Sequence, residues 1–176
     1  MTTSTIDSKI WSIAWPAIVA NISIPLLGLA DATLLGHLDS PRHLAAVAVG
    51  GAVMSFLYWG FSFLRMGTTG EVARAWGRGD EALALLILGR AVVMALGLAV
   101  LLGLLHNPLL QIGLALMNPA PGIHDLARAY AELRLYSAPA VLSTYAAVGW
   151  FIGHQNTRWP MAIVIVTNLA NIALDA

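Results

Sequence analysis

Residues 10–38 read IWSIAWPAIVANISIPLLGLADATLLGHL, an almost unbroken apolar stretch that contains one carboxylate, Asp31. A helix of about 29 residues would be roughly 43 Å long, which exceeds a hydrocarbon core of about 30 Å. The stretch is therefore predicted to cross a membrane with a tilt, a kink or a protruding end. Pro16 and Pro25 are candidate bending points, although membrane helices also tolerate proline without a functional bend. Asp31 is a candidate functional residue because ionisable groups are costly at membrane depth.

The composition of the whole chain favours the same class of protein. Of its 176 residues, 59% are hydrophobic and 10% are charged, and the mean hydropathy is +0.77. A soluble domain carries about 25% charged residues, so this chain is predicted to be an integral membrane protein. The formal net charge is zero, and without a basic cluster no nucleic-acid partner is expected. Cysteine is absent, which excludes disulfides, thiolate metal sites and thiol catalysis.

Four further apolar stretches follow the first one, and no low-complexity segment or linker divides the chain. We therefore predict an all-α fold, a polytopic membrane helical bundle that forms one transmembrane domain over residues 1–176. The five spans are predicted at approximately 10–38, 44–66, 83–105, 126–153 and 159–176. The connections between them are predicted at 39–43, 67–82, 106–125 and 153–158.

The basic residues suggest an orientation for these spans. With the N-terminus in the cytoplasm, four basic residues would lie on the cytoplasmic side and two on the outer side, in agreement with the positive-inside rule. The cytoplasmic set is Lys9, Arg74, Arg78 and Arg158, and the outer set is Arg42 and Arg128. We expect a multi-pass protein of the inner (cytoplasmic) membrane with a cytoplasmic N-terminus.

Asp31 and a second carboxylate, Asp175, are predicted to lie at similar depth. Asp31 is about seven residues, or roughly 10 Å, from the outer end of the first span. Asp175 is about 15 residues, or roughly 22 Å, beyond Pro160, where the fifth span enters from the inner side. Both carboxylates would lie in the outer half of the membrane, which permits a shared site.

Asn168, Asn171 and Asp175 stand at i, i+3 and i+7 and therefore share one face of the fifth span. Their oxygens are suitable ligands for Na⁺ and can hydrogen-bond a protonated carboxyl group. Burial and a second carboxylate nearby both favour the protonated form, so the two carboxylates could bind and release a proton near neutral pH. Alternatively, the asparagines form interhelical packing contacts, Asp175 lies at a frayed helix end, or Asp31 is structural.

Other polar and small residues give weaker signals. Arg65 is predicted to extend toward the membrane interface rather than bind a substrate. Glu132 and Arg134 are two residues apart, so they point to different helix faces and need separate partners. No catalytic motif or metal-binding motif is present, so neither an enzyme nor a metal site is predicted. Close helix packing in the third span is assigned to Gly89, Gly97 and Gly103.

Five motifs occur in order along the chain. They are PLLGLADATLLGHLD at 25–39, LRMGTTG at 64–70, YSAP at 136–139, GW with GHQN at 149–156 and NLANIALD at 168–175. In combination they resemble the first, second, fourth and fifth helices of multidrug and toxic compound extrusion (MATE) transporters, most closely the DinF branch. The similarity covers essentially the whole chain, and the combination is more specific than any single motif.

This resemblance implies a twelve-helix fold, with two six-helix lobes around a central cleft. It also implies efflux of cationic or amphipathic compounds, with H⁺ or Na⁺ as the coupling ion and no other cofactor. Asp31 would be the main coupling carboxylate, and Asn171 and Asp175 would belong to the same polar site. Pro16 would match a proline at which bending is linked to protonation.

Under the same resemblance the chain would end within the fifth helix of the N-terminal lobe. Alternating access needs two halves that move about a central site, so we expect a truncated portion that does not transport alone. Its partners would be the lipid bilayer, small-molecule substrates and the missing C-terminal lobe. The alternative is a non-transporting membrane fragment or an accessory protein that packs against a full-length transporter.

Overall fold

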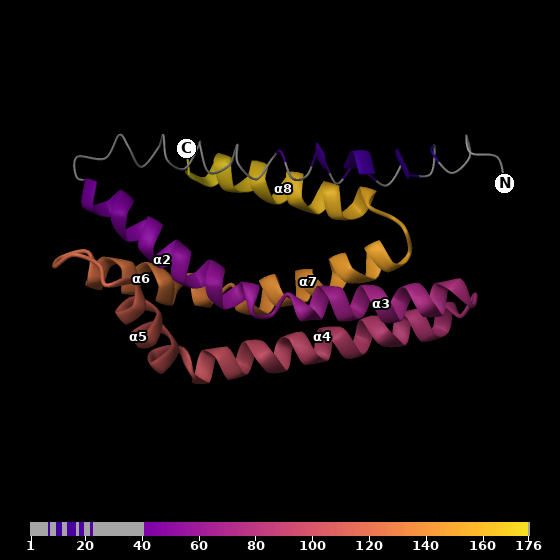
Figure 1. Ribbon diagram of the computed structural model, residues 1–176, viewed down its shortest axis with the longest axis horizontal. Coiled ribbons are helices and arrows are strands. Elements are labelled where there is room, and N and C mark those ends of the chain that lie inside the picture. Colours follow the sequence, from indigo (N-terminus) through magenta and orange to yellow (C-terminus); the bar gives the residue numbers. More distant parts are fainter. Residues whose placement is uncertain are drawn as a thin grey trace.

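The computed structural model describes residues 41–175, except for the side chains of Pro41 and of residues 171–175, together with a few earlier positions. These earlier positions are Asp7, Ile10, Trp11, Ala14, Trp15, Pro16, Ile18, Val19 and Ile22. All elements in the described part are helices (Figure 1). They are α2 (Pro41–Trp59), α3 (Phe63–Gly77), α4 (Glu81–Leu104), α5 (His106–Met117), α6 (His124–Leu135), α7 (Ala138–Gly153) and α8 (Arg158–Asp175).

The described helices include long apolar segments. Arg42–Gly77, which combines α2 and α3, and Glu81–Leu104 are each long and apolar enough to cross a membrane. A third crossing forms if α6 and α7, which meet at an angle of 54°, are counted as one bent span. The predicted fold class, an all-α membrane bundle, is confirmed.

The connection predicted at residues 67–82 is mostly helical. α3 continues through this segment, and only a short turn, with Gly79 at φ +72°, separates it from α4. Few apolar residues occur here, but Thr68 and Val72 are buried where α3 meets α4 and α7. Packing between helices therefore extends α3 beyond the apolar stretch. The Asp80 carboxylate then caps α4 by accepting a hydrogen bond of 2.9 Å from a backbone N–H of its first turn.

The connection predicted at residues 106–125 also contains a helix, α5, which begins directly after α4. Leu110 and Leu114 of α5 are almost completely buried, and the helix contacts α2 and α6. α5 ends at Asn118, which adopts the left-handed conformation with φ 44°. α2, α5 and α6 thus form one half of the described bundle, and α3, α4 and α7 lie side by side in the other half (Figure 1).

Small residues set the close packing of α4, but they are alanines rather than the predicted glycines. A Cβ at the predicted glycines would meet nothing within 4 Å, and all three are exposed: Gly89, Gly97 and Gly103. The buried side of α4 instead carries alanines at helical spacing, namely Ala84, Ala91, Ala95 and Ala99. Small side chains let membrane helices approach closely, and this face packs on α3 and α7.

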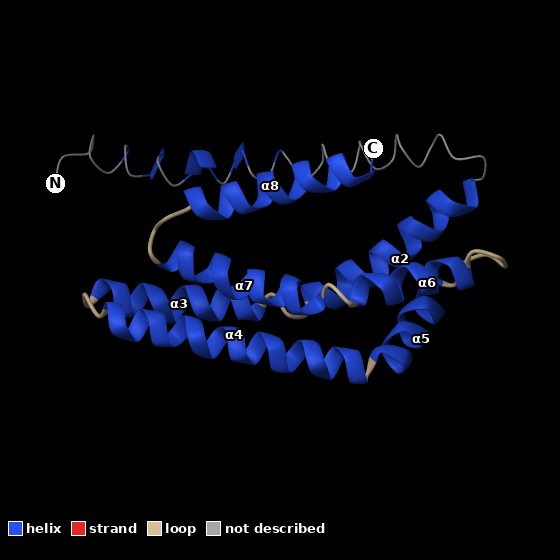
Figure 2. Ribbon diagram, turned by 180° about the vertical axis from the view of Figure 1, so that it is seen from behind, coloured by secondary structure: helices blue, strands red, loops and turns tan. Residues whose placement is uncertain are grey.

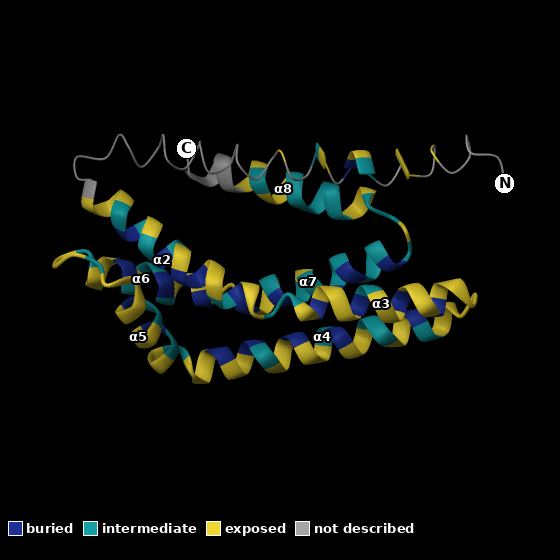
Figure 3. Ribbon diagram, in the orientation of Figure 1, coloured by how far each residue is buried: buried dark blue, intermediate teal, exposed yellow. Residues whose placement is uncertain are grey.

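The outer surface of the bundle is apolar, the reverse of a soluble protein. Four large hydrophobic side chains on α4, α5 and α6 are more than two-thirds exposed: Val93, Leu104, Leu116 and Leu133. Figure 3 shows exposed positions along the outer sides of these helices and buried positions where the helices meet. An apolar surface of this extent is expected to contact another apolar phase, and in a chain with membrane-length helices that phase is lipid.

The connections between α3 and α4, α5 and α6, and α7 and α8 lie at the two ends of the bundle, and short turns also occur near its middle (Figure 2). One end carries the turn after α3, with Arg74 and Arg78, and the start of α8 at Arg158 (Figure 1). The opposite end carries the start of α2 and the loop before α6, near Arg42 and Arg128. The five described arginines that the predicted topology assigns to the two sides of the membrane thus lie at opposite ends of the bundle, and the orientation relative to the cytoplasm stays a prediction.

Candidate functional site

The predicted coupling residues lie mostly outside what the structure describes. Asp31 and Pro25 fall outside the described residues, and Pro16 is buried within helical backbone. α8 is continuous from Arg158 to Asp175, so its backbone carries Asn168, Asn171 and Asp175 at separations that place them along one side of a helix. Asn168 is half-buried. The structure does not describe the side chains of Asn171 and Asp175. The coupling role of these residues and of Asp31 stays a prediction.

The described residues do contain a polar region at the middle of the bundle, where two helical segments are interrupted. Between α2 and α3 the chain makes a tight turn at Gly60–Ser62, in which the N–H of Phe61 bonds to the Tyr58 carbonyl at 3.0 Å. This three-residue spacing replaces the four-residue spacing of an α-helix. The turn lies near the midpoint of the apolar segment Arg42–Gly77, at the depth where an isolated backbone group would have no water.

The second interruption, between α6 and α7, follows from Pro139. Proline lacks an N–H and its ring clashes with the carbonyl four residues earlier, so α6 ends at Leu135 and α7 restarts at Ala138. The Arg134 carbonyl at this break accepts a 3.1 Å bond from the Ser137 N–H and a 2.6 Å bond from its hydroxyl. The YSAP sequence thus both breaks the helix and satisfies the backbone that the break opens.

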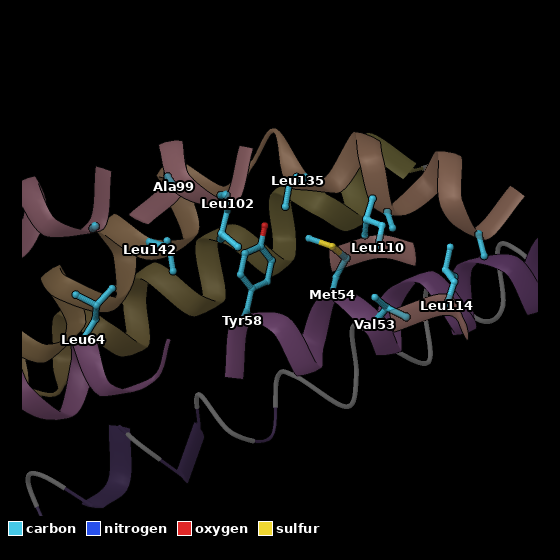
Figure 4. Close-up of a cluster of buried hydrophobic side chains, with 14 of the residues drawn as sticks. Val53, Met54, Tyr58, Leu64, Ala99, Leu102, Leu110, Leu114, Leu135 and Leu142 are labelled. Carbon is cyan, nitrogen blue, oxygen red and sulfur yellow. The ribbon is translucent and has the colours of Figure 1, made fainter. Parts of the chain in front are cut away.

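Tyr58 connects the two interruptions. Its hydroxyl donates to the Arg134 carbonyl at 3.3 Å and lies 3.4 Å from the Ser137 hydroxyl. The side chain is only 6% exposed and lies among the buried residues of the core, with its oxygen directed toward Leu102 and Leu135 (Figure 4). One buried phenol therefore holds two breaks, 76 residues apart in sequence, at the same level of the bundle.

Tyr58→Phe is expected to lower the free energy of unfolding by about 1 kcal/mol, because the ring stays buried while one hydrogen bond between the two broken helices is lost. The matched control is Tyr136→Phe, since Tyr136 is 85% exposed and its hydroxyl should contribute nothing. Thermal unfolding of the intact protein in a non-ionic detergent provides the measurement. Equal melting temperatures for the two variants would contradict this role of Tyr58.

A cavity of about 410 Å³ lies beside these interruptions. Its lining combines two arginines, two tyrosines and two serines with two apolar residues: Arg65, Arg134, Tyr58, Tyr145, Ser55, Ser62, Trp59 and Val141. They come from α2, α3, α6 and α7 and from the turn between α2 and α3. The cavity thus lies where the α2–α3 and α6–α7 segments are interrupted, and most of its lining side chains are polar.

The sequence predictions identified only part of this region. Arg65 was expected to extend toward the membrane interface, which stays a prediction; the structure shows that it is exposed and lines the cavity. The expectation that Glu132 and Arg134 have separate partners is confirmed: Glu132 pairs with Arg128 at 2.8 Å, and the Arg134 guanidinium donates to a tyrosine hydroxyl at 3.1 Å. Tyr58 and Tyr145 were missed. The sequence did contain one signal for this region: Arg65 and Arg134 both lie inside predicted spans, and charged residues are unusual at membrane depth.

A second polar region lies at the end of the bundle near the start of α8. The His154 ring lies 4.1 Å from the Trp150 ring and 4.8 Å from the Trp76 ring, measured between centroids. Trp150 also donates its indole N–H to the Ala84 carbonyl at 3.0 Å. These contacts join α3, α4 and the end of α7, so this region is a packing feature.

Comparisons with known proteins place the chain in a family. The family model described as MatE matches residues 16–176. The chain is 41% identical to DNA damage-inducible protein F of Escherichia coli (strain K12), over 96% of this chain and 37% of that protein. It is 29% identical to Protein DETOXIFICATION 44, chloroplastic, of Arabidopsis thaliana, over 97% of this chain and 35% of the relative. It is 28% identical to Multidrug resistance protein PmpM of Pseudomonas aeruginosa, over 95% of this chain and 35% of that protein.

The chain therefore spans little more than a third of the length of the curated relatives that it matches. No solved structure matches it. The family match covers nearly the whole sequence, including α2 to α8 and the predicted coupling residues. On this match, and on the identity with the E. coli protein, the chain belongs to the MatE family and to its DinF branch.

Proposed function

We propose that this chain forms most of the N-terminal lobe of a secondary transporter that exports cationic or amphipathic compounds. The observation that carries the proposal is the MatE match over residues 16–176, together with relatives named as multidrug resistance proteins. The chain covers about a third of those relatives, so export is proposed for the intact protein rather than for these 176 residues. H⁺ or Na⁺ would be the coupling ion, with no other cofactor.

The broken segments of the bundle support this proposal. Secondary transporters commonly build their sites near the middle of the membrane from discontinuous helices, because irregular backbone is tolerated where it lines a cavity. In the described part, both Arg42–Gly77 and the α6–α7 pair are interrupted near their midpoints, beside a polar cavity. A lobe of this construction can bend at defined points without exposing unpaired backbone groups to lipid.

In this proposal Asp31 is the main coupling carboxylate, and Asn171 and Asp175 complete the polar site from α8. Asn168 supports it from the same helix, and Pro16 and Pro25 let the first span bend as the coupling ion binds and leaves. The chemistry suits either ion, since carboxylate and amide oxygens bind Na⁺ and a carboxylate binds H⁺. The roles rest on the family motif and on the spacing of residues along α8.

Transport in this scheme needs a second lobe, because alternating access requires two halves that move about the site. We propose that the lobe lies in the inner membrane with its N-terminus in the cytoplasm, and that the second half comes from sequence outside these 176 residues. The coverage of about a third of each relative favours a second candidate as well. In that case the chain is a non-transporting fragment or accessory protein that packs against a complete transporter.

Ethidium accumulation in cells that lack their own efflux pumps tests the proposed function and separates the two candidates. We expect the intact protein to lower steady-state ethidium severalfold, and an ionophore that collapses the ion gradients to remove the effect. The 176-residue chain expressed alone is expected to leave ethidium unchanged. Unchanged ethidium with the intact protein, at confirmed membrane insertion, would contradict the transporter; lowered ethidium with the short chain alone would contradict the requirement for a second lobe.

A further inference from the structure

The two arginines of the mid-bundle cavity differ from Arg74 and Arg128, which form ion pairs with glutamates. Arg74 and Arg128 pair with Glu71 and Glu132 at 2.9 and 2.8 Å. Within the described part, no carboxylate pairs with the guanidinium of Arg65 or Arg134. The Arg134 guanidinium interacts with Tyr130, through a 3.1 Å hydrogen bond to its hydroxyl and a 5.8 Å approach to its ring. Both residues are exposed, and neither positive charge has an anionic partner among the described residues.

Their position makes these charges unusual. The midpoint of the apolar segment Arg42–Gly77 is close to Gly60, and Arg65 is five residues further on, roughly 8 Å along a helix. A hydrocarbon core extends about 15 Å on either side of its midplane, so Arg65 lies within it if the segment is centred. Arg134 lies at the α6–α7 break on the same cavity. Ionisable residues at such depth usually face a cavity and mark a ligand or ion pathway.

The described lining residues supply many hydrogen-bond donors, and none of them is a carboxylate. Each guanidinium presents N–H groups in a planar fork that matches the oxygens of a carboxylate or a phosphate. Hydroxyl groups of Ser55, Ser62 and Tyr145 line the same space and can also donate. A donor set with net positive charge is complementary to an oxyanion and unfavourable for a cation.

The remaining walls and the size of the cavity indicate what else the ligand carries. Trp59 and Val141 provide apolar surface next to the polar lining. A volume of about 410 Å³ lies within the range of small-molecule sites, which is roughly 300–1,000 Å³. It exceeds what a bare carboxylate or phosphate needs, and the extra space has hydrophobic and aromatic walls.

We propose that this cavity binds the carboxylate or phosphate group of an amphipathic anion, with Arg65 and Arg134 on its oxygens and its apolar part along Trp59 and Val141. None of the described residues that line the cavity is a proposed cation-coupling residue. This site does not depend on the proposed efflux, because binding can be measured without transport. Two sources offer this chemistry, a small organic anion and the phosphate of an anionic lipid headgroup.

Direct binding of octanoate to the intact protein in dodecyl maltoside, followed by titration calorimetry, tests the proposal. Wild type is expected to bind octanoate saturably, and octyltrimethylammonium, which has the same chain and opposite charge, is expected not to compete. Arg65→Gln and Arg134→Gln should each weaken octanoate binding by about tenfold or more, because each removes charge-assisted hydrogen bonds. Arg65→Lys keeps the charge and should bind with intermediate affinity.

Arg90→Gln is the matched control, since Arg90 is an exposed arginine of α4 that does not line the cavity. This variant should keep wild-type octanoate affinity. If a glutamine variant does not fold, as judged by thermal unfolding, the octanoate affinities of Arg65→Lys and Tyr145→Phe are compared with that of wild type instead, and both should be weaker. Equal octanoate affinity in wild type and in every cavity variant that folds would overturn the proposal.

Nanodiscs distinguish the two sources of the anion. If the ligand is a lipid headgroup, replacing part of the phosphatidylcholine with phosphatidylglycerol should raise the melting temperature of wild type but not of Arg65→Gln/Arg134→Gln, and it should weaken octanoate binding. If the ligand is a small anion, phosphatidylglycerol should have no such effect while octanoate still binds. Absence of saturable octanoate binding together with absence of the phosphatidylglycerol effect would also overturn the proposal.

Discussion

Asp31→Asn is expected to reduce coupled efflux by the intact protein to the background of control membranes, while expression and membrane insertion stay at wild-type levels. Asparagine has nearly the same shape as aspartate, but its side chain neither ionises nor takes up a proton near neutral pH. A coupling site that alternates between charged and protonated or Na⁺-bound forms would be locked in one neutral form. Drug movement would then lose its link to the ion gradient.

Asp125→Asn is the matched control for this experiment. The Asp125 side chain is 97% exposed at the start of α6, so the same loss of a carboxylate there should leave efflux unchanged. Ethidium efflux from energised everted vesicles, normalised to the amount of inserted protein, provides the measurement. Wild-type efflux by Asp31→Asn would remove Asp31 from the coupling mechanism, whatever the effect of other substitutions.

Gly149→Ala is expected to destabilise the bundle by about 1–3 kcal/mol, the usual cost of inserting atoms into a closely packed contact. A Cβ at Gly149 would lie 2.6 Å from the Arg65 carbonyl oxygen and 3.0 Å from Cβ of Thr68. The first neighbour is backbone, so α3 or α7 would have to move. The Thr69 hydroxyl donates to the Gly149 carbonyl at 3.2 Å and to the Arg65 carbonyl at 2.8 Å, and this bridge would be strained too.

Gly97→Ala tests whether the effect comes from the contact or from glycine itself. Gly97 lies in α4, where an added Cβ would meet nothing within 4 Å. Replacing glycine with alanine in a helix is favourable by roughly 0.5–1 kcal/mol when no contact is disturbed. Thermal unfolding of the two variants in the same detergent should therefore shift in opposite directions. A melting temperature for Gly149→Ala at or above that of Gly97→Ala would contradict the close α3–α7 contact.

The broad architecture could be predicted from the sequence because it depends on local properties. Apolar stretches of membrane length predicted helices, including one at 159–176, where α8 is found. The extension of α3 could not be predicted in the same way. Residues 67–77 are not strongly apolar, and they are helical because Thr68 and Val72 fit against α4 and α7.

The mid-bundle site depended on contacts between residues far apart in the chain. Pro139 marks a helix break in the sequence, but nothing local indicates that Tyr58 would satisfy the Arg134 carbonyl across 76 residues. Arg65 was assigned to the interface because a long side chain near an apparent loop usually reaches it. Once α3 is known to continue past Arg65, this residue is no longer beside a loop; it is exposed on the helix and lines the cavity.

Transport by the purified intact protein in liposomes tests the central claim, a cation-coupled exporter, most directly. Ethidium movement is followed while an H⁺ gradient, then a Na⁺ gradient, is imposed across membranes that contain no other protein. We predict that one of the two gradients drives ethidium against its own gradient, that ethidium in turn drives counter-movement of that ion, and that Asp31→Asn shows neither. Ethidium movement that is indifferent to both gradients would contradict the account.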